Sequence, residues 1–118
     1  MTPAERQAAI SAAVQRERQA GKLEWWWLSF VDPGLAVGSQ FLGACIVRAY
    51  GMGDACRVAH LLGINPGGAV HGLPAPEGLE PPPKWAARLL TARDCMAFEA
   101  EMRRRESITV SAPAAMKP

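Results

Sequence analysis

The stretch that decides the fold is residues 24–31, Glu-Trp-Trp-Trp-Leu-Ser-Phe-Val. Aromatic and branched side chains dominate it, and both types favour an extended strand. In such a strand Trp26, Leu28 and Phe30 share one face, because successive side chains alternate. The other face carries Trp25, Trp27, Ser29 and Val31. Since neither face is polar, a sheet built on this strand needs cover on both sides.

A second strand is predicted over 41–50, after the break at Asp32-Pro33-Gly34. It is apolar on both faces too, with Leu42, Ala44 and Ile46 opposite Phe41, Cys45 and Val47. Residues 54–62 predict a short helix that Asp54 caps and Gly63 closes, and residues 69–73 predict a third strand. A strand-helix-strand crossover joins parallel strands, so the third strand lies beside the first, and the sheet order is second, first, third.

Helices flank this unit on both sides. Thr2 and Glu5 form a capping box that opens a helix over about 3–20. Ile10 and Val14 are its only larger apolar side chains, so residues 1–22 are expected to form a loosely held arm. A Pro-rich spacer at 74–83 leads to a second helix over 92–105.

One stripe of the second helix carries Cys95, Phe98 and Met102. We expect this stripe and Trp85 either to cover the second face of the sheet or to dock on another subunit. Because the chain has few elements with which to cover two apolar faces, a homodimer is expected.

The fold class is therefore α+β, with a small three-stranded sheet in a β-β-α-β unit, one crossover helix, an N-terminal helical arm and a C-terminal helix. Residues 23–105 form the single domain, and residues 106–118 are expected to be a disordered tail. The predicted core consists of Trp26, Leu28, Phe30, Ile46, Val58 and Leu62.

Composition excludes several classes of protein. The chain has 118 residues, 49% of them hydrophobic, and a formal charge of +2. This charge is too small for a dedicated nucleic-acid domain, and no apolar run has the length of a membrane span. Three widely spaced cysteines argue against a disulfide framework, and the N-terminus does not resemble a secretory signal. We therefore expect a soluble cytoplasmic protein.

The sequence supports three kinds of chemical site only weakly. Gly51-Met52-Gly53 follows a strand and opens a helix, as a dinucleotide fingerprint does, but Cys56 replaces the third glycine. Cys56 and His60, with His71 nearby, lack a fourth ligand at a recognised zinc spacing. No serine or cysteine lies in a pattern typical of a nucleophile. We expect no metal, no cofactor and no enzymatic activity.

The turn at Gly63-Ile64-Asn65-Pro66-Gly67-Gly68 is the most unusual local feature. Its glycines allow a conformation in which successive N–H groups converge on an anion, and Asn65, Gly67 and Gly68 are the candidate residues. Arg48 and Arg57 would add charge, and Trp25 or Trp27 would stack on a planar group. A helix C-terminus that runs into a tight turn explains the same residues without any ligand.

Two functions thus stay open. The first is a non-catalytic binding module for a small anionic, nucleotide-like ligand. The second is a protein-interaction module, an inhibitor or adaptor of another protein, in which an exposed tryptophan face and the arginines of the C-terminal helix contact the partner.

The combination Trp27-Leu28-Ser29-Phe30, Phe41-Leu42-Gly43 and Gly63-Ile64-Asn65-Pro66-Gly67-Gly68 resembles a group of short uncharacterised proteins from bacteria and their phages. The resemblance covers about residues 25–95 and implies no catalytic residues. It implies that the protein acts by binding, either to a host protein or to a small signalling molecule.

Overall fold

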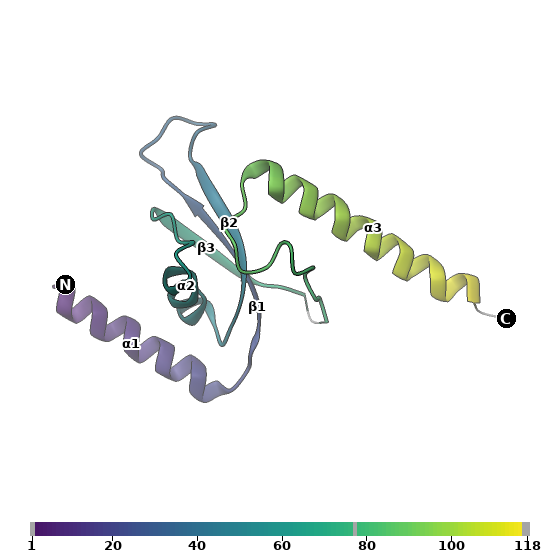
Figure 1. The fold of residues 1–118 in the computed structure, drawn as a ribbon. Helices are drawn as coiled ribbons and strands as arrows, with labels where there is room; N and C mark the ends of the chain where they lie inside the picture. The colour runs from purple at the N-terminus through teal and green to yellow at the C-terminus, as the bar shows by residue number, and fades with distance from the viewer. Residues whose placement is uncertain (1, 77, 117–118) are drawn as a thin grey trace.

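The computed structural model describes the backbone of residues 2–76 and 78–116, and the side chains of residues 2–76 and 78–105. Along the chain follow α1 (Pro3–Ala20), β1 (Glu24–Val31), β2 (Phe41–Ala49), α2 (Met52–Leu61), β3 (Ala69–Pro74) and α3 (Ala92–Met116). Figure 1 shows α2 on one side of the sheet and the segment that leads into α3 on the other. The predicted α+β class is confirmed.

The three strands form one antiparallel sheet in the order β2-β1-β3. The central strand pairs Leu28 with Cys45 of β2 and with Gly72 of β3. Because β2 and β3 both run antiparallel to β1, they are parallel to each other, and α2 connects them across the sheet. The predicted strand order is therefore confirmed.

A bulge interrupts β2 at Leu42. The register shifts between Phe30 and Val31, so Leu42 is an extra residue in its strand. Simple alternation predicts that Leu42 shares a face with Ala44 and Ile46, but Leu42 packs against the cluster on the opposite face. The prediction was wrong because one inserted residue reverses the alternation.

The first face of the sheet, which α2 covers, holds the larger core cluster. Leu28 and Phe30 are buried there, and Trp26 and Val58 are half-buried against them. Leu62, however, is 50% exposed, so its place in the predicted core was wrong. The helix ends one residue earlier, at Leu61, and Ile64 packs against the cluster instead. The buried members of this cluster are Leu28, Phe30, Cys45, Val47, Ala49, Ala55 and Ala59.

The second face is covered by the chain between Trp85 and α3. Phe98 stacks on Trp27 with ring centroids 5.7 Å apart, and Trp85 meets Phe98 edge to face. Leu90 forms a backbone bridge to Ala44 at the outer edge of β2. This arrangement is the first of the two alternatives predicted for residues 85–105. It also removes the exposed apolar face on which the expectation of a homodimer rested, so the oligomeric state stays a prediction.

The terminal helices extend beyond the sheet. Within α1 the buried side chain is Val14, and α1 lies against α2. The bounds of α3 are longer than the predicted 92–105, but its side chains from 106 onward lie outside the described residues. The predicted disorder of 106–118 therefore stays a prediction. In the described part of the chain no helix is both long and apolar enough to cross a membrane.

Candidate functional site

The structure separates the predicted site residues into two groups at opposite ends of β1. Gly68 lies against Val31, the last residue of β1, and a Cβ at Gly68 would collide with the Val31 carbonyl oxygen. Trp25 and Arg48 form a register pair at the beginning of β1. Val31 follows Trp25 by six positions, a rise of about 20 Å along the strand. The turn and Arg48 therefore do not build one site.

The turn at residues 63–68 is explained by its role as the link between α2 and β3. The Asn65 Oδ1 atom accepts a hydrogen bond from the Gly67 N–H at 2.8 Å, and Pro66 has no N–H to offer. Gly67 and Gly68 have φ values of 90° and 75°, which glycine adopts without strain. Since one donor of the turn is engaged and another is missing, the turn fits a tight link between α2 and β3 better than an anion site.

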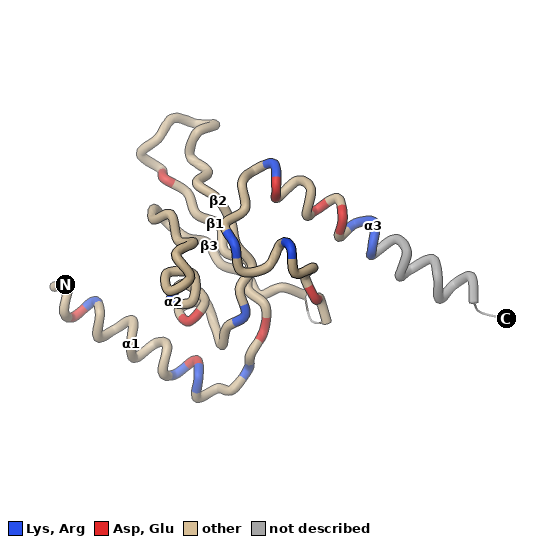
Figure 2. Tube along the Cα trace, in the orientation of Figure 1, with Lys and Arg blue, Asp and Glu red and all other residues tan. Residues whose placement is uncertain are grey.

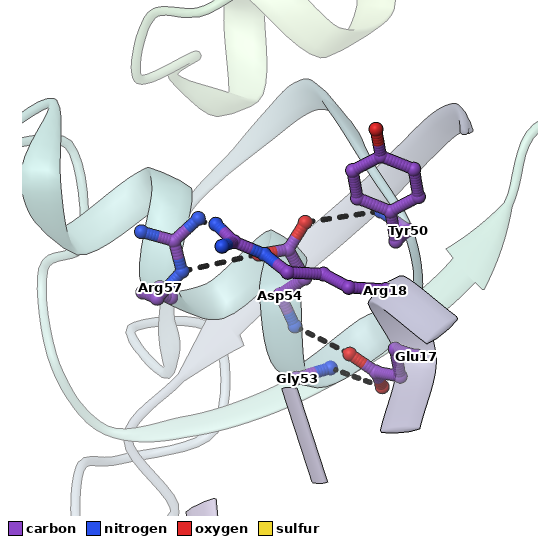
Figure 3. Close-up of polar contacts among 6 residues, drawn as sticks. All are labelled: Glu17, Arg18, Tyr50, Gly53, Asp54 and Arg57. Carbon is purple, nitrogen blue, oxygen red and sulfur yellow. Dashed lines mark hydrogen bonds and ion pairs between the residues drawn. The ribbon is translucent and has the colours of Figure 1, made fainter. Parts of the chain in front are cut away.

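Arg57 is held by Asp54, whose side chain is buried. Its Nε and Nη2 atoms donate to Asp54 Oδ1 at 3.1 and 2.9 Å, and Asp54 is 2% exposed. The Tyr50 N–H donates to Asp54 Oδ2 at 3.1 Å, and Arg18 Nε lies 3.7 Å from Oδ1. Figure 3 shows these groups around one carboxylate. Two of the three guanidinium nitrogens of Arg57 are therefore paired with a buried carboxylate.

Glu17 of α1 completes this network at the N-terminus of α2. Its two carboxylate oxygens accept hydrogen bonds from the N–H groups of Gly53, at 3.0 Å, and Asp54, at 2.8 Å. These donors have no partner within the helix, so Glu17 caps it from a distant segment. Sequence analysis missed this role because no local pattern links Glu17 to residues 36 and 37 positions later.

Trp25 and Arg48 lie together at the wall of a cavity that we call the polar pocket. The Arg48 guanidinium carbon lies 5.9 Å from the centroid of the Trp25 ring. The Ala75 N–H donates to the Trp25 carbonyl at 2.8 Å and so fastens the following loop beside the pocket. The pocket has a volume of about 200 Å³ and is lined by Lys22, Leu23, Glu24, Trp25, Arg48, Ala75, Pro76, Gly78, Leu79 and Glu80.

The charges around the polar pocket are mixed. Lys22 Nζ lies 3.9 Å from Glu24 Oε2, whereas Arg48 is exposed and makes no ion pair with any described residue. Along the described trace, cationic and acidic residues intersperse and form no single basic stripe (Figure 2). Trp25 Nε1 is buried and has no hydrogen-bond partner within the described residues. Arg48 is thus the cation of this pocket that has no carboxylate within ion-pair distance among the described residues.

Trp27 belongs to a different environment from Trp25, although the two share the second face. Its ring stacks on Phe98 and lines a second cavity, the apolar pocket, of about 200 Å³. This pocket is lined by Trp27, Ile46, Leu73, Pro74, Ala75, Pro76, Leu79 and Phe98. The loop residues Ala75, Pro76 and Leu79 contribute to both pockets.

The cysteines lie in environments that disfavour the thiolate. Burial, with a smaller contribution from Cys56, raises the pKa of Cys45 to about 12. Burial also raises the pKa values of Cys56 and Cys95. A protonated thiol is a poor nucleophile and a poor metal ligand. Among the described residues no three His, Cys, Asp or Glu side chains gather as a metal site would require.

Comparison with known proteins gives no family: the chain matches no family model, no curated protein and no solved structure. The resemblance to short proteins of bacteria and phages therefore stays a prediction.

Proposed function

We propose that this protein is a non-catalytic binding module for a small anionic ligand with a planar, nucleotide-like group, and that the ligand binds in the polar pocket. The observation that carries the proposal is the placement of Arg48 over the Trp25 ring beside a cavity, without a carboxylate partner among the described residues. A guanidinium offers paired donors to a phosphate or carboxylate, and an indole offers a face for stacking. Three free cysteines support a cytoplasmic location.

The lining of the polar pocket limits what can bind. Its volume of about 200 Å³ is smaller than the roughly 300–1,000 Å³ typical of ligand sites, so part of a nucleotide would stay outside. Glu24 and Glu80 also line it, and Lys22 is close to Glu24. The anionic group should therefore lie toward Arg48, away from these carboxylates.

The protein-interaction alternative loses the surface on which it was based. Trp27 stacks on Phe98, and Trp25 lies under Arg48, so these indoles do not form one exposed face. The arginines of α3 do not gather in one place either, since Arg93 lies in its first turn and the others are at 103–105. We therefore rank anion binding first.

A thermal-shift experiment with nucleoside monophosphates tests the proposal. A ligand at ~100 times its Kd stabilises by about 2.7 kcal/mol, which should raise the Tm by on the order of 10 °C. Arg48→Gln should abolish the shift, and the uncharged nucleosides should give a much smaller one. Arg16→Gln is the matched control, because Arg16 is exposed on α1 and loses the same charge elsewhere.

Asn65→Ala distinguishes the polar pocket from the turn. The variant removes the acceptor of the Gly67 N–H but lies at the other end of the sheet, so ligand binding should persist. Loss of the shift in Asn65→Ala, with Arg48→Gln unaffected, would place the ligand at the turn. A flat response to nucleotides, phosphate and small carboxylates would reject the proposal.

A further inference from the structure

β3 is an edge strand, and no described residue pairs with its outer side. It pairs with β1 alone, and no other described segment makes a backbone hydrogen bond to residues 69–74. An open edge presents a row of unpaired N–H and C=O groups, which another extended chain can satisfy. The short length of β3 and its terminal Pro74 limit such pairing to a few residues.

The register identifies the outward groups. Ala75 donates to the Trp25 carbonyl, one step beyond the pair Trp26 with Pro74, so the odd-numbered residues of β3 direct their backbone groups toward β1. Val70 and Gly72 therefore direct their N–H and C=O groups outward. Pro74 offers only a carbonyl there and ends the donor row.

The apolar pocket opens beside this edge, on the second face. Leu73 and Pro74 of β3 form part of its wall, and Trp27 and Phe98, which are more buried, form another part. Leu73 is 66% exposed, so it does not close the pocket. No charged side chain lines this cavity, in contrast to the polar pocket on the other side of loop 75–79. An apolar cavity of about 150 Å³ is sufficient to hold a benzene-sized group.

We propose that β3 accepts an extended peptide of a partner protein as a fourth strand, and that the apolar pocket receives one bulky apolar side chain of that peptide. Two features of different chemistry select this occupant. The open edge requires backbone donors and acceptors, which a helix or a lipid tail does not offer. The pocket favours an apolar side chain, because no charged side chain lines it and most of its lining is aliphatic or aromatic. This function is additional to anion binding and does not depend on it.

The probe is a short blocked peptide that alternates threonine and valine around a central leucine, with a lysine at each end. Binding should shift the amide resonances of Val70 and Gly72 and slow their hydrogen exchange. Replacing the central leucine by alanine should weaken binding several-fold, because the pocket then stays unfilled.

Two N-methylated versions of the peptide test for strand addition. One blocks the amides along one edge of the peptide and the other blocks those along the opposite edge. Only one edge of an added strand faces β3, so one version should bind at least tenfold more weakly while the other binds as the parent does.

Leu73→Glu tests the pocket from the protein side and should weaken binding at least tenfold. Leu61→Glu is its control. Leu61 on α2 is 69% exposed, so its replacement should lower the free energy of unfolding as little as the replacement of Leu73 does. Arg48→Gln should leave peptide binding unchanged, which separates this proposal from the anion site.

Three outcomes would overturn the proposal. One is the absence of amide shifts at Val70 and Gly72 with millimolar peptide. Another is equal binding of both N-methylated peptides and the parent, which would assign the pocket to a free apolar group. The last is protection of the same amides by raising the protein concentration alone, which would assign the edge to a second copy of this chain.

Discussion

At the scale of single residues, the contacts around Asp54 explain how α1 is attached to α2. Its side chain is 2% exposed, and burying a carboxylate is costly unless hydrogen bonds and opposite charge compensate. Arg57 and the Tyr50 N–H supply that compensation, while Arg18 approaches from α1. Glu17 adds a second carboxylate that caps the same helix. The sparsely buried α1 is therefore attached by polar contacts more than by apolar packing.

Replacement of Glu17 should measure this attachment. Glu17→Ala leaves the Gly53 and Asp54 N–H groups without their acceptor, and the free energy of unfolding should fall by about 1 kcal/mol, as for other lost helix caps. Arg16→Ala, its neighbour on the exposed side, should stay within about 0.5 kcal/mol of the unmodified protein. Urea denaturation of both variants is the measurement. Equal effects of the two variants would show that the cap does not stabilise the fold.

At the scale of elements, the sheet buries side chains on both faces. Leu28 is fully buried under α2, and Ile46, on the adjacent strand, is buried on the other face beneath Trp85 and Phe98. The segment before α3 reaches the sheet closely because Gly43 has no side chain. A Cβ there would lie 2.6 Å from the Leu89 side chain, and its φ of +144° also favours glycine.

Truncating a buried side chain on either face of the sheet should therefore lower the free energy of unfolding by a similar amount. Leu28→Ala and Ile46→Ala should each lower the free energy of unfolding by about 2–5 kcal/mol, because each leaves a cavity in a packed cluster. Leu61→Ala removes a leucine that is 69% exposed and should cost far less. A loss below about 1 kcal/mol at Ile46 alone, measured by urea denaturation, would mean that the second face is not a true core.

At the scale of the whole molecule, one long segment closes the second face. Trp85 donates through Nε1 to Glu101 Oε2 at 3.0 Å, and Lys84 Nζ lies 2.8 Å from Glu101 Oε1. The hydrogen bond from Lys84, with a weaker one from Trp85, lowers the pKa of the Glu101 carboxyl below its ordinary value. These contacts hold the chain before α3 to the helix itself, so that both cover Trp27 together.

Phe98→Ala should open this cover. We expect a loss of about 3 kcal/mol of stability, a red-shifted tryptophan emission as Trp27 gains solvent, and self-association through the uncovered face. Met96→Ala is the control, because Met96 is 72% exposed on the same helix. Light scattering and fluorescence measure both variants. If Phe98→Ala is as stable and as weakly associating as Met96→Ala, α3 does not protect the second face.

The sequence by itself determined the elements and their order. The aromatic strand at 24–31, the short helix that Gly63 follows and the handedness of crossovers were sufficient, because propensity, turn residues and chirality act over a few neighbouring residues or one connection. Local signals also made Trp25 and Arg48 candidate site residues, a role that stays a prediction, and the register places them opposite each other.

Only the tertiary structure decided which distant groups meet. The bulge at Leu42, the cap that Glu17 forms on α2 and the separation of Asn65 from Arg48 depend on how whole elements pack. A one-residue slip in register moves the following side chains to the opposite face of the sheet, so a local pattern cannot decide which face they occupy. The two groups of candidate residues lie at opposite ends of an eight-residue strand, about 20 Å apart, and a local pattern does not show that distance either. The open edge of β3 likewise exists because no described segment follows it across the sheet, a property of the finished fold and not of its six residues.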